Sequence, residues 1–362
     1  MKTAILRLAT WHRDRARWRR VDRAGGPRVF YGFDCLPGPA DRAGGGIVKV
    51  QDLRRAFPNH PRGANLLYLV SSARPLFAAR MARMARRAGA RLVVNQNGVA
   101  YPGWHGPGWE RTNEEMRELA AAADHVIYQS AFCRESADRF LGPRDGPSSV
   151  LLNPVDTAVF TPAEGDPAPG ALVLLLAGTH EAFYRVRSAI ETLARLRAGR
   201  RDARLIVAGR CAWRPGAGAA LDEAREAARA LGVAGAVEFR GPYTQAEAPG
   251  LLRSAHVLLH TKYNDPCPRL VAEALAGGLP VVYSASGGVP EIVGPGAGVG
   301  VPAPRDYERD HPPAAEALAE AVRQVDARRA EFARAARGRA VAALDVRPWI
   351  EAHRRIFEEA LA

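Results

Sequence analysis

Two carboxylates and a glycine turn in the second half of the chain have the residue types and spacing of a nucleotide site. Asp265 and Glu273 lie eight positions apart, shortly before a Ser-Gly-Gly turn at 286–288. A carboxylate can accept two hydrogen bonds from a ribose diol, and glycines let a phosphate approach backbone N–H groups closely. We therefore expect a nucleoside-diphosphate site whose acids bind hydroxyl groups. Arg269, four positions before Glu273, leaves open a plain salt bridge along a helix.

The elements around these residues read as helix, strand, turn and helix. Residues 269–276 have one apolar face, which predicts an amphipathic helix. Residues 279–283 form a short apolar run, which is typical of a buried parallel strand. Because parallel sheets bind ligands at the carboxyl ends of their strands, we expect the N–H groups of residues 286–288 to point at phosphate.

The segment 264–294 resembles the C-terminal signature of the retaining glycosyltransferases of the GT-B fold, glycosyltransferase family 4 (group 1) type. That family has E-x7-E, then EAxAxGxPVV and a GGxPE turn, and this chain has EALAGGLPVV and GGVPE. Asp265 stands where the family usually has its first Glu. A second, weaker likeness is NPVDTAVFTP at 153–162, which is similar to the interdomain NGVDTxxFxP of the family.

The resemblance implies an α/β protein of the GT-B fold. Two Rossmann-like doubly wound domains would face each other across a cleft, and the C-terminal helix would cross back to the first domain. We expect an acceptor-side domain at 1–162, a nucleotide-sugar-binding domain at 163–345 and the returning helix at 346–362. The stretch 162–170, rich in proline and glycine, is the expected interdomain linker.

The resemblance also implies an activity. A sugar would pass from a nucleotide-diphosphate sugar, of UDP or GDP type, to a hydroxyl acceptor with retention of configuration and without a metal or other cofactor. The acceptor could be a glycan, a lipid-linked compound or a small molecule. Two alternatives stay open, one because Asp265 is shortened and Thr179 replaces a usual Arg, and the other because further enzymes share the GT-B architecture. The first is a nucleotide-sugar-binding protein with little turnover, and the second is a GT-B phosphorylase or sugar-nucleotide epimerase.

Residue roles follow from the same resemblance. Asp265 would contact the donor sugar, Glu273 the ribose, and Arg185 the departing diphosphate. Further expected donor-binding residues are Gly178, Arg187, Asn264, Pro268, Arg269, Leu270, Ser286, Gly287 and Gly288. The expected acceptor-side residues are Gly45, Gly46, Asn95, Asn97 and His105. For these, the competing interpretations are a flexible glycine loop, an Asx turn before Gly98 and a structural histidine.

Strand–helix alternation along both halves predicts a doubly wound α/β architecture. In the first half, strands are expected at 3–9, 65–72, 91–98 and 124–130. In the second half, they are expected at 171–178, 203–209, 236–241 and 256–261, before the signature. One long helix is expected at about 314–343, and a last helix after Pro348.

Composition narrows the class of partner. The 362 residues carry 51 Lys and Arg against 38 Asp and Glu, for a net charge of +13. The arginines are spread over many predicted helices without interleaved aromatic residues, so we expect no nucleic-acid partner. Arginine-rich stretches at 13–23 and 80–87 leave open a peripheral contact with a membrane surface.

Cysteine spacing and the N-terminal sequence bear on metals and location. The four cysteines have no zinc-type spacing, so we expect no metal site and reduced thiols. No signal-peptide pattern and no apolar run of membrane-spanning length is present in the sequence. We therefore expect a cytoplasmic protein, with the inner membrane face as an alternative location.

Overall fold

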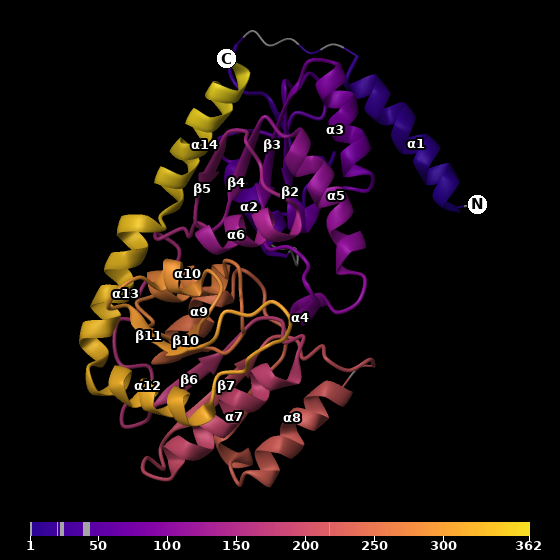
Figure 1. Cartoon of the computed structure of the whole chain (residues 1–362). Coiled ribbons are helices and arrows are strands. Elements are labelled where there is room, and N and C mark those ends of the chain that lie inside the picture. The colour runs from indigo at the N-terminus through magenta and orange to yellow at the C-terminus, as the bar shows by residue number, and fades with distance from the viewer. Residues whose placement is uncertain (1, 20, 22–24, 39–43, 217) are drawn as a thin grey trace. The chain divides into compact units, whose positions relative to one another are not determined.

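The computed structural model describes residues 2–19, 21, 25–38, 44–216 and 218–362, with side chains from residue 10 onward. The chain divides into two compact units (Figure 1). Unit 1 comprises Met1–Leu152 and Val346–Ala362, and unit 2 comprises Asn153–Asp345. Each unit has a parallel β-sheet flanked by helices, which confirms the two Rossmann-like α/β domains expected from the sequence.

Unit 1 is built on a five-stranded parallel sheet in the order β1-β2-β3-β4-β5. Its strands are β1 Val29–Phe30, β2 Leu66–Val70, β3 Arg91–Gln96, β4 His125–Tyr128 and β5 Ser148–Val150. Its helices are α1 Lys2–Arg17, α2 Gly45–Leu53, the 3-10 turn η1 Ser71–Ala73, α3 Ala78–Arg87, α4 Pro102–His105, α5 Trp109–Ala122, α6 Ala131–Phe140 and α14 Val346–Leu361. Every residue of β2 is buried, as expected of a strand covered on both faces.

The last helix of the chain completes the core of unit 1. The apolar residues of α14 recur at helical spacing and form one stripe toward the sheet. This stripe packs in one cluster with α2 and β2, whose members include Val50, Leu53, Leu66, Tyr68, Val70, Trp349, Ile356 and Phe357. The expected return of the C-terminal helix to the first domain is thus confirmed.

Unit 2 has a six-stranded parallel sheet in the order β11-β10-β9-β6-β7-β8. Its strands are β6 Val173–Leu176, β7 Arg204–Ala208, β8 Val237–Arg240, β9 Val257–His260, β10 Val281–Ala285 and β11 Gly298–Pro302. Its helices are α7 Phe183–Arg197, α8 Ala219–Ala230, η2 Ala234–Ala236, α9 Ala248–Arg253, α10 Arg269–Ala276, α11 Val289–Val293, α12 Ala315–Ala327 and α13 Arg329–Ala343.

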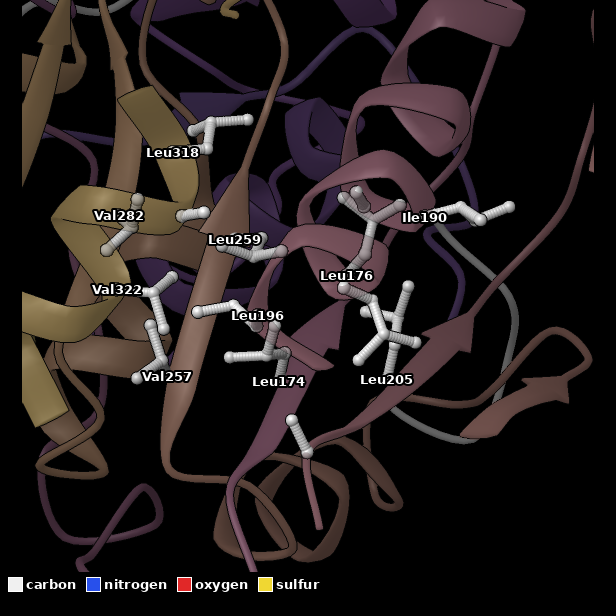
Figure 2. Close-up of a cluster of buried hydrophobic side chains, with 14 of the residues drawn as sticks. Leu174, Leu176, Ile190, Leu196, Leu205, Val257, Leu259, Val282, Leu318 and Val322 are labelled. Carbon is white, nitrogen blue, oxygen red and sulfur yellow. The ribbon is translucent and has the colours of Figure 1, made fainter. Parts of the chain in front are cut away.

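The core of unit 2 lies between this sheet and the helices α7 and α12. Figure 2 shows leucine and valine side chains of β6, β7, β9 and β10 directed toward apolar residues of these helices. The labelled members are Leu174, Leu176, Ile190, Leu196, Leu205, Val257, Leu259, Val282, Leu318 and Val322. This packing fixes the strand ends from which the candidate site is built.

The division between the units falls after Leu152 and not after residue 162. The segment 153–162 is bonded to unit 2, because Asn153 Nδ2 donates to the Cys267 carbonyl at 2.6 Å and Arg337 Nη1 donates to the Phe160 carbonyl at 2.8 Å. The stretch 162–170, expected as the linker, therefore lies inside unit 2. The second junction lies between Asp345 and Val346.

Two local expectations differ from the structure, and one strand has no counterpart among the expectations. The expected strand at 3–9 is wrong, because these residues are part of helix α1. The expected long helix at 314–343 is two helices, which meet at Arg328 with φ −128° and ψ 31°. The strand β11 was not expected, since its sequence GVGVP contains residues that favour loops.

Candidate functional site

The candidate site lies where the strand order of unit 2 reverses. From β6 the chain adds β7 and β8 on one side, and then β9, β10 and β11 on the other. The loops that follow β6 and β9 therefore diverge at the junction of these two adjacent strands. In open α/β sheets, ligands bind outside the carboxyl ends of the strands at such a point. Most of the expected donor-binding residues lie on these two loops and on the turn after β10.

Arg185 is the basic residue that the first turn of α7 places at this point. Arg185 is buried, with 7% of its surface exposed. Nη1 donates to the Thr179 carbonyl at a long 3.3 Å, and Nη2 lies 3.9 Å from Glu181. Its Nε is buried and has no hydrogen-bond partner among the described residues. A buried guanidinium with spare donors is suited to an anionic ligand.

Arg187 has a different environment. Its side chain is 60% exposed, and its Nε donates to Glu191 one turn along the same helix at 2.7 Å. Of the two basic candidates on α7, only Arg185 is therefore turned into the protein.

Asp265 follows β9 and is held in its ionised form. Its Oδ2 lies 3.2 Å from Lys262 Nζ and 3.2 Å from His260 Nε2. Burial alone would raise the pKa of Asp265, but Lys262 and His260 outweigh it and hold that pKa well below its ordinary value. The carboxylate thus presents a negative charge at the switch point.

A further, half-buried carboxyl, that of Asp310, interacts electrostatically with Arg185 and Lys262. Burial raises the pKa of Asp310, although Tyr184, Arg185 and Lys262 each favour its ionised form. Burial of the Tyr184 hydroxyl, together with the nearby Asp310, raises the pKa of Tyr184 to about 12. The site therefore combines two cations with two acidic groups in a poorly solvated place.

The glycine turn after β10 is packed against the Asp265 loop. Gly287 has φ +65°, and a Cβ there would lie 2.4 Å from the Asp265 carbonyl oxygen. The Gly288 N–H donates to that carbonyl at 2.9 Å, and the Ser286 N–H donates to Ser284 at 2.7 Å. The expectation that these amides point at phosphate therefore differs from the structure, in which two of the three have partners inside the chain.

Asn264 is used to hold neighbouring loops together. It adopts a left-handed conformation, with φ 49°. Its N–H donates to Ser286 Oγ at 2.8 Å, and its Nδ2 donates to the Asp306 carbonyl at 2.8 Å. These bonds fix the position of the adjacent Asp265.

The start of α10 brings the remaining donor-side residues to the same loops. Pro268 is the residue before the helix, and a Cβ at Gly178 would lie 3.9 Å from Leu270. Arg269 Nε donates to Glu273 Oε1 at 2.9 Å, so the salt bridge considered from the sequence is present. The pair fixes the orientation of the Glu273 carboxylate.

In unit 1, the acceptor-side asparagines lie in a polar cluster at the end of β3. Lys49 Nζ donates to Asn95 Oδ1 at 3.1 Å and to Asn97 Oδ1 at 3.0 Å. Gln129 Nε2 donates to both of these oxygens as well. The N–H of Asn97 donates to Ser71 Oγ at 2.8 Å. Lys49 and Gln129 were not anticipated from the sequence.

The other acceptor-side candidates have local roles. A Cβ at Gly46 would lie 2.7 Å from Ser72 Oγ, so this glycine allows α2 to approach η1 closely, whereas a Cβ at Gly45 would meet open space. His105 ends the short helix α4, is exposed, and its Nε2 lies 2.8 Å from Thr112 Oγ1. The structure does not include His105 in the Asn95–Asn97 cluster.

The arginine-rich stretches are partly neutralised. Residues 20, 22 and 23 of the first stretch lie outside the described residues. In the described part, Arg13 pairs with Asp34 at 3.2 Å, and Arg80 pairs with Asp14 at 3.4 Å. Of the described helices, none combines the length and apolar character needed to span a membrane. Over the same residues, no group of three or more His, Cys, Asp and Glu is placed to hold a metal ion.

Lys262 is the functional candidate in unit 2 that sequence reasoning missed. No motif includes it, but one signal was present. Only three of the 51 basic residues are lysines, namely Lys2, Lys49 and Lys262. Lys49 and Lys262 both lie in polar clusters next to residues predicted from the sequence.

Comparison with known proteins gives a family match within unit 2. Residues 164–339 match the family described as Glycosyl transferases group 1. A D-inositol 3-phosphate glycosyltransferase of Streptomyces bingchenggensis (strain BCW-1) is 31% identical over 208 residues, which are 53% of this chain and 45% of the relative. A glycogen synthase of Mycobacterium tuberculosis is 31% identical over 216 residues, which are 57% of this chain and 50% of the relative. The chain thus spans about half the length of these relatives.

Solved structures match over most of the chain. Anabaena HepE in complex with UDP-glucose has a TM-score of 0.67 at 20% identity, covering 86% of this chain and 82% of HepE. Sucrose-phosphate synthase from Thermosynechococcus elongatus has a TM-score of 0.66 at 18% identity, covering 86% of this chain and 76% of the synthase. These likenesses confirm the GT-B fold.

Proposed function

We propose that this chain is a group 1 glycosyltransferase that moves a sugar from a nucleotide-diphosphate sugar to a hydroxyl acceptor with retention of configuration. The observation that supports it most is the placement of Arg185. Its buried, under-bonded guanidinium lies at the switch point of the unit that matches the family, beside the ionised Asp265. Arg185 would stabilise an anionic leaving group, and Asp265 would accept hydrogen bonds from sugar hydroxyls at the same place.

The proposed donor is of the UDP type, with GDP as the alternative. HepE was solved with UDP-glucose, which supports a uridine nucleotide. Glu273 would accept hydrogen bonds from the ribose, and Asp265 from a hydroxyl of the donor sugar. The acceptor would be a hydroxyl compound held by the Asn95–Asn97 cluster of unit 1.

In the proposed reaction, the bond between the anomeric carbon and the diphosphate oxygen breaks, and Arg185 stabilises the negative charge that develops on this oxygen. The acceptor oxygen then bonds to the anomeric carbon on the same face of the sugar. The departing diphosphate takes the proton of the acceptor hydroxyl, so atoms and charge balance without a further reagent.

A second candidate is a protein that binds nucleotide sugars without turnover. It is favoured by the partners of Ser286 and Gly288, whose amides bond inside the chain. Release of UDP from UDP-glucose distinguishes the two, since only an enzyme releases more UDP than there are protein molecules.

The test of the proposed function is nucleotide binding by calorimetry. Wild-type protein is expected to bind UDP, or GDP if the donor is a guanosine nucleotide. Glu273→Ala should weaken this binding by about 2–4 kcal/mol, because two charge-assisted hydrogen bonds to the ribose are lost. Glu320→Ala is the matched control, since Glu320 is a 58% exposed carboxylate of unit 2 that pairs with Arg323. A wild-type protein that binds neither nucleotide would overturn the proposal, and an unchanged affinity in Glu273→Ala would overturn the ribose role.

A further inference from the structure

We propose that Lys262 binds the diphosphate of the nucleotide sugar as a second cation beside Arg185, an inference that rests on the proposed function. Lys262 lies in the loop after β9, three residues before Asp265. Its side chain is 21% exposed, so it is accessible to a ligand and still partly desolvated. Charge-assisted hydrogen bonds are stronger in such surroundings than in open solvent.

Side chains, more than the backbone of the glycine turn at 286–288, are available to bind the diphosphate. The N–H groups of Ser286 and Gly288 donate to carbonyls of the chain, so they are not free to hold a phosphate. A diphosphate carries more than one negative charge, and Arg185 supplies only one positive charge. A second cation from a neighbouring loop would neutralise the remaining charge.

The loop that carries Lys262 is hydrogen-bonded to the start of the helix that carries Arg185. Thr261 Oγ1 donates to the Arg185 backbone carbonyl at 2.8 Å, which bonds the loop after β9 to the start of α7. Asp310 interacts electrostatically with both Arg185 and Lys262. The bond from Thr261, the residue before Lys262, places the backbone of the loop after β9 against the start of α7, and we infer that one phosphate group of the ligand is shared by the two cations.

The identity of this residue supports a specific role. The chain uses arginine almost everywhere, with three lysines among 51 basic residues. An ammonium is a compact charge with three donors, whereas a guanidinium is a planar fork. Lys262 can therefore keep its contact of 3.2 Å with Asp265 and donate to a phosphate with another hydrogen.

The experiment compares uridine, UMP and UDP binding by calorimetry in the full chain. Lys262→Met should weaken UDP binding at least tenfold and leave uridine binding within twofold, because uridine has no phosphate. Lys262→Arg should recover part of the loss, since it keeps the charge. Arg323→Met is the control for loss of one positive charge, since Arg323 is a half-exposed residue of α12 that pairs with Glu320.

A double variant separates binding of phosphate from support of Asp265. If Lys262 contacts phosphate, Lys262→Met should still weaken UDP binding at least fivefold when Asp265→Asn is already present. If Lys262 acts only by neutralising Asp265, this loss should vanish in the Asp265→Asn background, which overturns the inference. Equal losses for uridine and UDP, or an unchanged UDP affinity, overturn it too, while the proposed function survives as long as wild-type protein binds UDP. A wild-type protein that binds no nucleotide overturns both.

Discussion

At the scale of single residues, the site shows that a residue type can be predicted correctly while its partner is not. Gly287 and Gly288 were expected to admit a phosphate, but the close neighbour of Gly287 is the Asp265 carbonyl. Lys262 belongs to no recognised pattern, so its pairing with Asp265 emerges only from the fold. Arg185 could be anticipated, because it opens a helix after the first strand of the unit.

Gly287 is expected to tolerate no side chain. Its positive φ and the 2.4 Å approach of a Cβ to the Asp265 oxygen require the Asn264–Asp265 loop to shift in Gly287→Ala. We expect a loss of about 1–3 kcal/mol in stability of unit 2 and at least tenfold in UDP-glucose turnover. The control is Gly250→Ala in α9, where a Cβ meets nothing within 4 Å. Equal behaviour of the two variants in thermal unfolding and turnover would contradict the packing argument.

Asp265→Asn tests whether the carboxylate takes part in turnover. The substitution removes a negative charge but keeps the shape, so kcat/KM for UDP-glucose should fall at least tenfold, or about 1.4 kcal/mol in transition-state stabilisation. UDP affinity should change much less, because Asp265 is assigned to the sugar. Full activity in this variant would reduce the catalytic role of the D-x7-E pair to Glu273.

At the scale of elements, buried strands were the most predictable part of the chain. Runs such as 65–72 and 171–178 contain β2 and β6, because strands covered on both faces are apolar throughout. The stretch 3–9 was misassigned because a short apolar-rich segment does not distinguish strand from helix. The break at Arg328 has no Gly or Pro to signal it, so it follows from tertiary packing.

Helix α14 should make unit 1 sensitive to acid through His353. This residue is fully buried, its Nδ1 donates to the Trp349 carbonyl at 2.9 Å, and its Nε2 lies 3.2 Å from the Tyr68 hydroxyl. Burial lowers the pKa of His353 to about 3, from 6.5. Between these values the unfolded chain binds a proton that the folded chain does not, so stability falls as pH drops from about 6.5 toward 3.

The slope from this one group is about 1.4 kcal/mol per pH unit in that window. His353→Gln keeps a donor and an acceptor but does not titrate, so it should make the loss of stability between pH 6 and 4.5 shallower. Denaturant unfolding of unit 1, followed at several pH values, measures this slope. Identical slopes in the variant and the wild-type protein would show that His353 is protonated as readily in the folded state as in the unfolded state.

At the scale of the whole molecule, the GT-B resemblance anticipated two Rossmann-like units and the return of the last helix. It did not anticipate the position at which the chain first passes from unit 1 to unit 2. Residues 153–162 are bonded to the rest of unit 2 by hydrogen bonds from the Asn153 side chain to the Cys267 carbonyl and from the Arg337 side chain to the Phe160 carbonyl, which a composition-based linker assignment cannot detect. A stretch rich in proline and glycine marks a surface loop as readily as a linker.

Because the end of the chain belongs to unit 1, a substitution near residue 362 should affect the unit that contains residues 10–152. Phe357 is fully buried against Phe57 and Tyr68, with ring centroids at 5.0 and 5.7 Å. Phe357→Ala should lower the free energy of unfolding of unit 1 by about 3–5 kcal/mol, from lost burial and the cavity left behind. Arg355→Ala, at an exposed position of the same helix, is the control and should change this free energy by less than about 0.5 kcal/mol.

Calorimetric unfolding measures both effects. UDP affinity below the first transition should be unchanged, since the proposed nucleotide site lies in unit 2. A fall in UDP affinity in Phe357→Ala, at a temperature where unit 1 is still folded, would contradict the assignment of nucleotide binding to unit 2 alone.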